Sequence, residues 1–138
     1  MGTQCLRNSR KLGNALRDGP NPEPKPADGW EAHHLVEGGR DNTFADGARD
    51  LLSANQIDID SRVNGVWLPK TAAARAAPAN VASHGSTFGN GYSEAVLEHL
   101  EGKISGKTDP SEVKQALLDG LAEIKLKLQT GTGPFAWP

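Results

Sequence analysis

The sequence has a single cysteine, Cys5, among 138 residues. One thiol cannot form an internal disulfide, and it has no second thiolate with which to build a cysteine-based zinc site. A disulfide scaffold and a zinc finger are therefore both excluded. No run approaches the roughly 20 apolar residues of a membrane-spanning helix, and residues 1–20 lack the apolar core of a secretory signal. We therefore expect no segment of this sequence to cross a membrane.

The sequence also lacks an excess of basic residues. Fifteen Lys and Arg residues against 17 Asp and Glu residues give a net charge of −2, which excludes the overall basicity of a histone-like protein. The charges are nevertheless segregated, because residues 61–93 contain three basic residues and no acidic one. A chance distribution is one explanation of this segregation. The other is a phosphate-binding surface that uses Arg62, Lys70 and Arg75, with the acidic residues of segment 37–60 facing away from it.

The length is sufficient for one domain with a modest core. Within it we distinguish an N-terminal helix and proline-rich linker over residues 1–27 from a main domain over residues 28–138. Hydrophobic periodicity and proline positions predict short strands among several helices, an α+β fold that is helical for most of its length. We expect strands at 30–36 and 66–69, and helices at 6–17, 44–54, 72–77, from about 93 and from 110 to about 130.

The last of these helices has the clearest pattern. Asp109 is suited to the N-cap, Pro110 to the first helical position and Gly131 to the position beyond the end. Apolar residues then recur along one stripe of the helix, at Val113, Leu117, Leu121, Ile124 and Leu128. We expect that stripe to face the core.

Adjacent histidines at 33 and 34 are the first candidates for chemistry. Successive side chains of a strand point to opposite faces, so His33 and His34 cannot comfortably ligate one metal together. The pair is better suited to two separate roles, in which one imidazole ligates a cation and the other accepts a proton near neutral pH. Taken alone the pair is a weak signal, since two partly exposed histidines at a strand end are common. Asn64-Gly65 alone would likewise indicate only a hairpin turn.

Three separated motifs in order make a more specific pattern. They are Ala32-His33-His34, then Gln56-Ile57-Asp58-Ile59 leading to Asn64-Gly65-Val66-Trp67-Leu68-Pro69, and finally His84 before Tyr92. Together they resemble the AHH family of the HNH nuclease superfamily, over most of the chain from about Leu12 onward. The resemblance implies a ββα-metal core, in which two strands and a helix surround one divalent ion.

The resemblance also implies a role for each matching residue. His33 and His84 would be metal ligands, His34 the general base, and Asn64 the residue that fixes the loop behind the base. Such a site suits phosphodiester hydrolysis, which needs a base for water and a cation near the phosphoryl oxygens. In the absence of the resemblance, His84 would be read as a hydrogen-bonding residue of a glycine-rich loop, and Trp30 and Trp67 are expected in the core.

One position departs from the family pattern. Members usually have a second histidine one turn after His84, where this sequence has Phe88. Two imidazoles completed by oxygen ligands would suit Mg²⁺, with Mn²⁺, Ni²⁺ and Zn²⁺ as alternatives. The same departure is also compatible with a weakened or inactive nuclease.

AHH domains typically end bacterial polymorphic toxins. The resemblance therefore implies a DNA endonuclease, carried at the C-terminus of a secreted effector in bacterial competition. Such a domain acts in the cytoplasm of a target cell and is neutralised by a cognate immunity protein. Two alternatives remain at this point: a degenerate, non-catalytic ββα module that binds nucleic acid or protein, and an RNase toxin.

Overall fold

The structure is a computed structural model that describes residues 2–18, 22–26, 28–37, 43–69 and 90–130. The helix expected at 72–77 lies outside these residues. The described elements are α1 (Gly2–Arg17), β1 (Trp30–His34), α2 (Thr43–Ala54), a 3₁₀ turn η1 (Arg62–Asn64), β2 (Gly65–Pro69), α4 (Asn90–Ile104) and α5 (Pro110–Thr130). This is an α+β fold with most of its described residues in helices, as predicted. No helix in the described ranges is long and apolar enough to cross a membrane.

Strands β1 and β2 form a two-stranded antiparallel sheet. Trp30 pairs with Pro69 at one end and His34 pairs with Gly65 at the other. The expected strand over 30–36 is two residues shorter in the structure: the N–H of Leu35 still donates to the carbonyl of Asn64 at 2.8 Å, but the N–H of Val36 donates to the side-chain Oδ1 of Asn64 at 2.8 Å. The histidine pair therefore lies at the end of β1, beside the start of β2.

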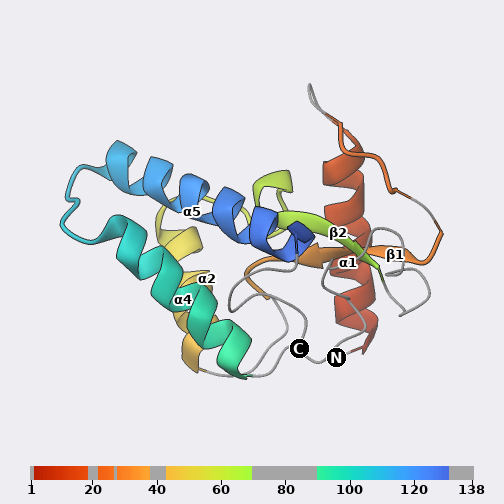
Figure 1. Ribbon diagram of the computed structural model, residues 1–138, viewed down its shortest axis with the longest axis horizontal. Coiled ribbons are helices and arrows are strands. Elements are labelled where there is room, and N and C mark those ends of the chain that lie inside the picture. The colour runs from red at the N-terminus through yellow and green to blue at the C-terminus, as the bar shows by residue number, and fades with distance from the viewer. Residues whose placement is uncertain (1, 19–21, 27, 38–42, 70–89, 131–138) are drawn as a thin grey trace.

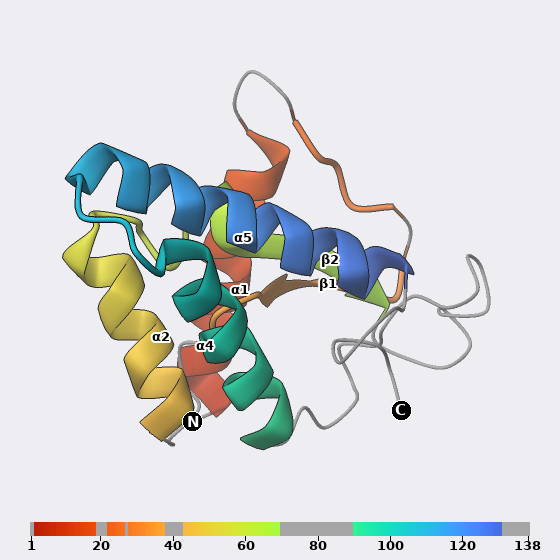
Figure 2. The same ribbon diagram turned by 60° about the vertical axis from the view of Figure 1, so that its left-hand side comes forward.

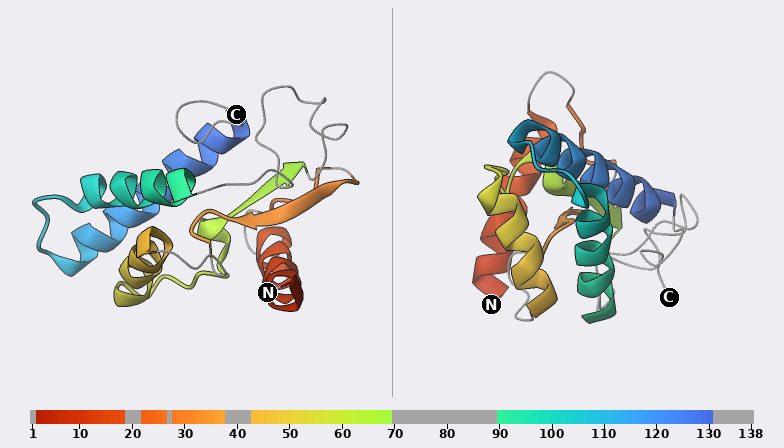
Figure 3. Two further views of the ribbon diagram at one scale, coloured as in Figure 1. Left: turned by 90° about the horizontal axis from the view of Figure 1, so that it is seen from below. Right: turned by 90° about the vertical axis from the view of Figure 1, so that its left-hand side faces the viewer.

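The sheet lies between two helices, with a second group of helices beside it. Helix α1 packs on β1 and β2, and α5 packs on β2 and η1. Figure 3, left, shows α1 and the C-terminal part of α5 on opposite sides of the sheet. Figure 1 shows α2 and α4 on the left of the molecule and α1 on the right, and Figure 2 shows α2 beside α4. The end of β1 and the start of β2 therefore lie where the sheet meets the helical group.

Helix α1 is attached to the sheet by fully buried leucines and by a close backbone approach. Leu12 and Leu16, which share a face as their i, i+4 spacing predicts, are 0% exposed. They lie over Gly65, where an added Cβ would be 2.7 Å from Cδ1 of Leu12. A side chain at position 65 would therefore push α1 away from the strand.

The linker after α1 is also fixed to the rest of the fold. The N–H of Glu23 donates to the carbonyl of Leu16 at 2.6 Å, and the indole N–H of Trp67 donates to the carbonyl of Glu23, also at 2.6 Å. The Glu23 carboxylate accepts from Nζ of Lys125 on α5 at 2.6 and 2.8 Å. The described part of the linker thus connects α1, β2 and α5.

Helix α5 begins as its sequence predicts. The carboxylate of Asp109 accepts a hydrogen bond from the N–H of Glu112 at 3.1 Å, which is N-cap geometry. Hydrogen bonds from the Ser111 hydroxyl and from that N–H hold the pKa of Asp109 below its ordinary value. The apolar stripe of α5 then enters the core, which also contains Trp30 and Trp67, as expected.

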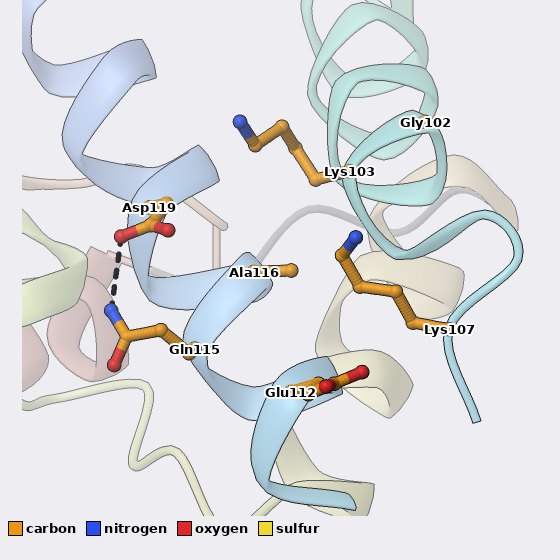
Figure 4. A pocket seen from close by; sticks show the side chains of 7 residues that line it. All are labelled: Gly102, Lys103, Lys107, Glu112, Gln115, Ala116 and Asp119. Carbon is orange, nitrogen blue, oxygen red and sulfur yellow. Dashed lines mark hydrogen bonds between the residues drawn. The ribbon is translucent and has the colours of Figure 1, made fainter. Parts of the chain in front are cut away.

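A hollow of about 530 Å³ lies between the end of α4 and the start of α5, at the end of this helix pair that points away from the sheet (Figures 1 and 4). Its lining has charges of both signs and is formed by Gly102, Lys103, Lys107, Glu112, Gln115, Ala116 and Asp119. The side chain of Gln115 donates to Asp119 at 3.0 Å within α5. None of the residues singled out for chemistry lines this hollow.

Candidate functional site

Four of the seven predicted site residues lie in the described part of the chain. His33 and His34 end β1, and Arg62 and Asn64 form the 3₁₀ turn before β2. The register that pairs His34 with Gly65 brings these two segments together. The other three, Lys70, Arg75 and His84, lie outside the described residues, as does Phe88.

The two histidines have different surroundings. The His33 residue is 6% exposed, and its ring lies edge-on to the ring of Tyr92, with centroids 6.2 Å apart. The His34 side chain is 11% exposed, and its Nε2 lies 2.8 Å from Oδ1 of Asp60. One imidazole is thus packed against α4, while the other is hydrogen-bonded to the turn that precedes η1. These different environments are consistent with different roles for the two rings.

Asn64 connects the strand ends to the turn behind them. Its side chain is fully buried, and Oδ1 accepts a hydrogen bond from the N–H of Val36 at 2.8 Å. Nδ2 donates to the carbonyl of Val36 at 3.2 Å and to that of Ile59 at 2.8 Å. A buried amide with three backbone partners holds those backbone segments in one arrangement. Asn64 therefore fixes the chain immediately after the histidine pair.

Tyr92 on α4 also bonds the backbone that directly follows the histidine pair. Its hydroxyl donates to the carbonyl of Leu35 at 2.7 Å. Burial raises the pKa of this phenol well above its ordinary value, and the negative charge of Glu37 raises it further. The hydroxyl therefore stays protonated and remains a hydrogen-bond donor. The backbone at Leu35 and Val36 is thus held by both Asn64 and Tyr92.

Asp60 is the site residue that the sequence did not reveal. It belongs to the acidic segment 37–60, which we expected to face away from the phosphate-binding surface, and the structure places its carboxylate against His34. Its carboxylate is 13% exposed and reaches both His34 and, at 3.8 Å, Nζ of Lys11 on α1. The alternation of Asp58 and Asp60 with isoleucines places both acids on one side, but it does not tell which of them meets a histidine.

The described part of the chain shows no complete set of metal ligands. No three His, Cys, Asp or Glu side chains within it lie close enough together to hold an ion. Of the predicted ligands, the described residues include only His33, a buried imidazole at the end of β1. An imidazole is a suitable ligand for the divalent ions considered above, so His33 fits one position of such a site.

A profile of the AHH family, described as a nuclease family of the HNH/ENDO VII superfamily with conserved AHH, matches residues 16–128. The chain belongs to this family. The match includes both strands, helices α2 and α4, and α5 almost to its end. No curated protein and no solved structure gives a significant match.

Membership of the AHH family makes this chain a nuclease domain, whose substrate class is nucleic acid. The tripeptide that names the family occurs here once, as Ala32-His33-His34. In the structure, Ala32 is buried in the core and pairs with Trp67 of β2, while the two histidines end the strand. HNH/ENDO VII nucleases generally use divalent metal ions.

Proposed function

We propose that this AHH domain is a metal-dependent endonuclease that hydrolyses DNA phosphodiester bonds. The observation that carries the proposal is the buried Asn64, which bonds the backbone on both sides of the site and fixes the chain directly after His33 and His34. A general base must be held within hydrogen-bond reach of the water that it deprotonates. The Asn64 contacts favour such a fixed position for the pair.

In this proposal the two histidines have different roles. His34 accepts a proton from the attacking water, and His33 would hold the divalent ion together with His84. When bound, the ion stabilises negative charge on the phosphoryl and leaving oxygens. Mg²⁺ is the first candidate, because two imidazoles completed by oxygen atoms suit it better than they suit a closed structural zinc site; Mn²⁺, Ni²⁺ and Zn²⁺ are alternatives.

Phosphate contacts would come from the segment without acidic residues. Arg62 lies in η1, two residues before Asn64, and is partly exposed. We include Lys70 and Arg75 as further phosphate contacts because they follow β2 in the same acid-free segment. Local positive charge of this kind supports binding to the DNA backbone despite a net negative chain.

We further propose a biological role as the toxic C-terminal domain of a bacterial secreted effector. The domain would act in the cytoplasm of a target cell and would be neutralised by a cognate immunity protein. This part of the proposal rests on the resemblance to AHH domains that end polymorphic toxins. Expression in the bacterial cytoplasm should therefore arrest growth, and the His34→Ala variant should relieve the arrest. Growth equal to that of an empty-vector strain would contradict the toxic role.

The nuclease activity is tested with purified protein, supercoiled plasmid and a structured RNA. Each is incubated with Mg²⁺, Mn²⁺, Ni²⁺, Zn²⁺ or a chelator. We expect plasmid cleavage that needs a metal ion and that falls about 10²–10⁴-fold in His34→Ala, the range for loss of a general base. His99→Ala is the matched control, because His99 bonds Glu123 between α4 and α5.

The other outcomes distinguish the remaining functions. Cleavage of RNA alone would replace the DNase with an RNase. Binding of plasmid without cleavage under any metal condition would support the non-catalytic module, with Phe88 in place of the second helical histidine as its cause. Equal cleavage by His34→Ala and the parent would refute the assignment of the base.

A further inference from the structure

Asp60 and His34 meet from separate segments of the fold. His34 ends β1, whereas Asp60 lies in the turn between α2 and η1, 26 residues further along the chain. Their side chains are 11% and 13% exposed, and Nε2 and Oδ1 are 2.8 Å apart. Pairing at this distance with so little exposure to water restricts the orientation of the imidazole ring.

The contact also selects the tautomer of His34. An ionised carboxylate can only accept hydrogen bonds, so Nε2 must carry the hydrogen and donate it to Asp60. In the neutral ring the lone pair then lies on Nδ1, which makes no hydrogen bond to the described residues. A histidine held in this form presents Nδ1 as the proton-accepting atom.

The position of Asp60 is itself determined by its neighbours. Its N–H donates to the carboxylate of Asp58 at 2.8 Å, and the hydroxyl of Ser61 donates to the carbonyl of Asp58 at 2.6 Å. On the preceding side, the carbonyl of Ile59 accepts from Nδ2 of Asn64 at 2.8 Å. The residues on both sides of Asp60 are therefore bonded, and its carboxylate has little freedom to leave the imidazole.

Lys11 contributes little to this arrangement. Its Nζ is 3.8 Å from the other carboxylate oxygen of Asp60, and its side chain is 71% exposed. An exposed pair at that distance is screened by water and salt. The interaction that matters for His34 is therefore the hydrogen bond from Nε2.

We propose that Asp60 is the positioning residue of His34: it holds the ring with Nε2 protonated, so that Nδ1 accepts the proton from the attacking water. The proposal rests on the function proposed above, in which His34 is the base. Asp60 touches neither substrate nor metal in this scheme. Its effect on the reaction passes entirely through the imidazole, in the way that an orienting carboxylate acts on a catalytic histidine in general.

Steady-state cleavage tests this role through the separation of kcat from KM. We expect Asp60→Ala to lower kcat about 10- to 100-fold, the size of effect seen when an orienting partner of a functional histidine is removed. KM should change by less than about threefold, since in this scheme Asp60 does not touch the DNA. Asp50→Ala removes the same charge from an exposed position of α2 and should leave both constants unchanged.

A double-mutant cycle separates positioning from general damage to the fold. If Asp60 acts only through His34, Asp60→Ala should cause no further loss of kcat in a His34→Ala background. An additional loss as large as in the parent would show that Asp60 acts elsewhere and would overturn the proposal. The unfolding midpoint of each variant is measured alongside.

The tautomer can be observed without any turnover. Long-range ¹H–¹⁵N NMR correlation of the His34 ring should show the Nε2–H form in the parent and in Asp50→Ala, and a mixture of tautomers in folded Asp60→Ala. The same mixture in the parent would refute the proposal. If the parent has the Nε2–H form but never cleaves nucleic acid, the proposed nuclease function fails while Asp60 remains the residue that orients His34.

Discussion

At the residue scale, the side chains that bond His34 or the backbone beside it differ in whether the sequence identifies them. Asn64 is marked by its place in the family motif, and the structure shows its amide bonded to three backbone groups. Asp60 carries no such mark, and the motif that ends at Tyr92 does not tell what its hydroxyl bonds, because their partners His34 and Leu35 are 26 and 57 residues away. Periodicity reports which face of an element is buried, and it carries no information about which distant polar group a side chain meets.

Replacement of Asn64 is expected to destabilise the fold strongly. Asn64→Ala would leave the N–H and the carbonyl of Val36 and the carbonyl of Ile59 without this partner, and buried backbone groups left unbonded are costly. We expect the free energy of unfolding to fall by on the order of 3 kcal/mol, measured by urea denaturation.

Asn55→Ala is the matched control for that measurement. The Asn55 side chain donates one hydrogen bond to the carbonyl of Leu51, four residues earlier, at 2.8 Å and in a partly exposed position. Its loss should cost about 1 kcal/mol or less. Equal effects of the two substitutions would mean that Asn64 is not a special structural contact.

At the element scale, the contact between α1 and β2 attaches the N-terminal helix to the sheet that carries the two histidines. Gly65 lies directly under Leu12 and Leu16, and an added Cβ would be 2.7 Å from a leucine methyl group that is already fully buried. We expect Gly65→Ala to lower the free energy of unfolding by about 1–3 kcal/mol, the usual cost of overpacking a core.

Two comparisons test whether this cost comes from the contact itself. Gly102→Ala on α4 meets no atom within 4 Å and should stabilise the protein by about 0.5–1 kcal/mol, because alanine favours helix over glycine. In addition, Gly65→Ala should cost less in a Leu12→Ala background, where the clash is relieved. Additive effects of the two changes would place the origin of the cost outside the α1–β2 contact.

Helices α4 and α5 are joined by contacts of one carboxylate, Glu123, from which we predict a loss of stability in acid. Glu123 accepts hydrogen bonds from Lys103 and from His99, each at 2.8 Å. The hydrogen bond from Lys103 is the main reason that the pKa of Glu123 is below its ordinary value, and the bond from His99 lowers it further. Because the folded state favours the ionised form, this contribution is present above the ordinary pKa and is lost as the pH falls through the lowered one.

The measurement is the urea midpoint as the pH falls from 7 to about 3, across the ordinary range of a glutamate pKa. Glu123→Gln should lose stability at pH 7 and should show a smaller further loss in acid than the parent. Glu101→Gln, an exposed glutamate on α4, is the control and should follow the parent curve. A parent and a Glu123→Gln variant with parallel pH curves would show that these contacts have no role in acid stability.

At the scale of the whole molecule, the sequence predicts elements better than it predicts their contacts. The long helix α5, its cap at Asp109 and the two strands follow from local periodicity and local hydrogen bonding. The attachment of the linker does not, since Glu23 meets Lys125 across 102 residues and Trp67 across 44. Such contacts depend on how the elements pack, which is why the sequence did not reveal that Asp60 meets His34.

The distribution of charge leads to a prediction about the whole molecule on DNA. The net charge is −2, so affinity for a polyanion must come from a local surface rather than from the chain as a whole. Each phosphate contact contributes about 0.9 to the slope of log K against log salt concentration. We therefore expect the triple variant Arg62→Ala, Lys70→Ala, Arg75→Ala to bind DNA more weakly and to reduce that slope by about 2–3.

Binding is measured in the His34→Ala background without added metal, so that the DNA stays intact while the salt concentration is varied. The control is Lys107→Ala with Lys114→Ala; Lys107 lines the hollow of Figure 4, and Lys114 lies near the start of α5. Its slope should equal that of the background, because these cations lie at the end of the helix pair that points away from the sheet. If the control pair lowers the slope and the triple variant does not, the DNA binds along α4 and α5, and the acid-free segment is not the phosphate-binding surface.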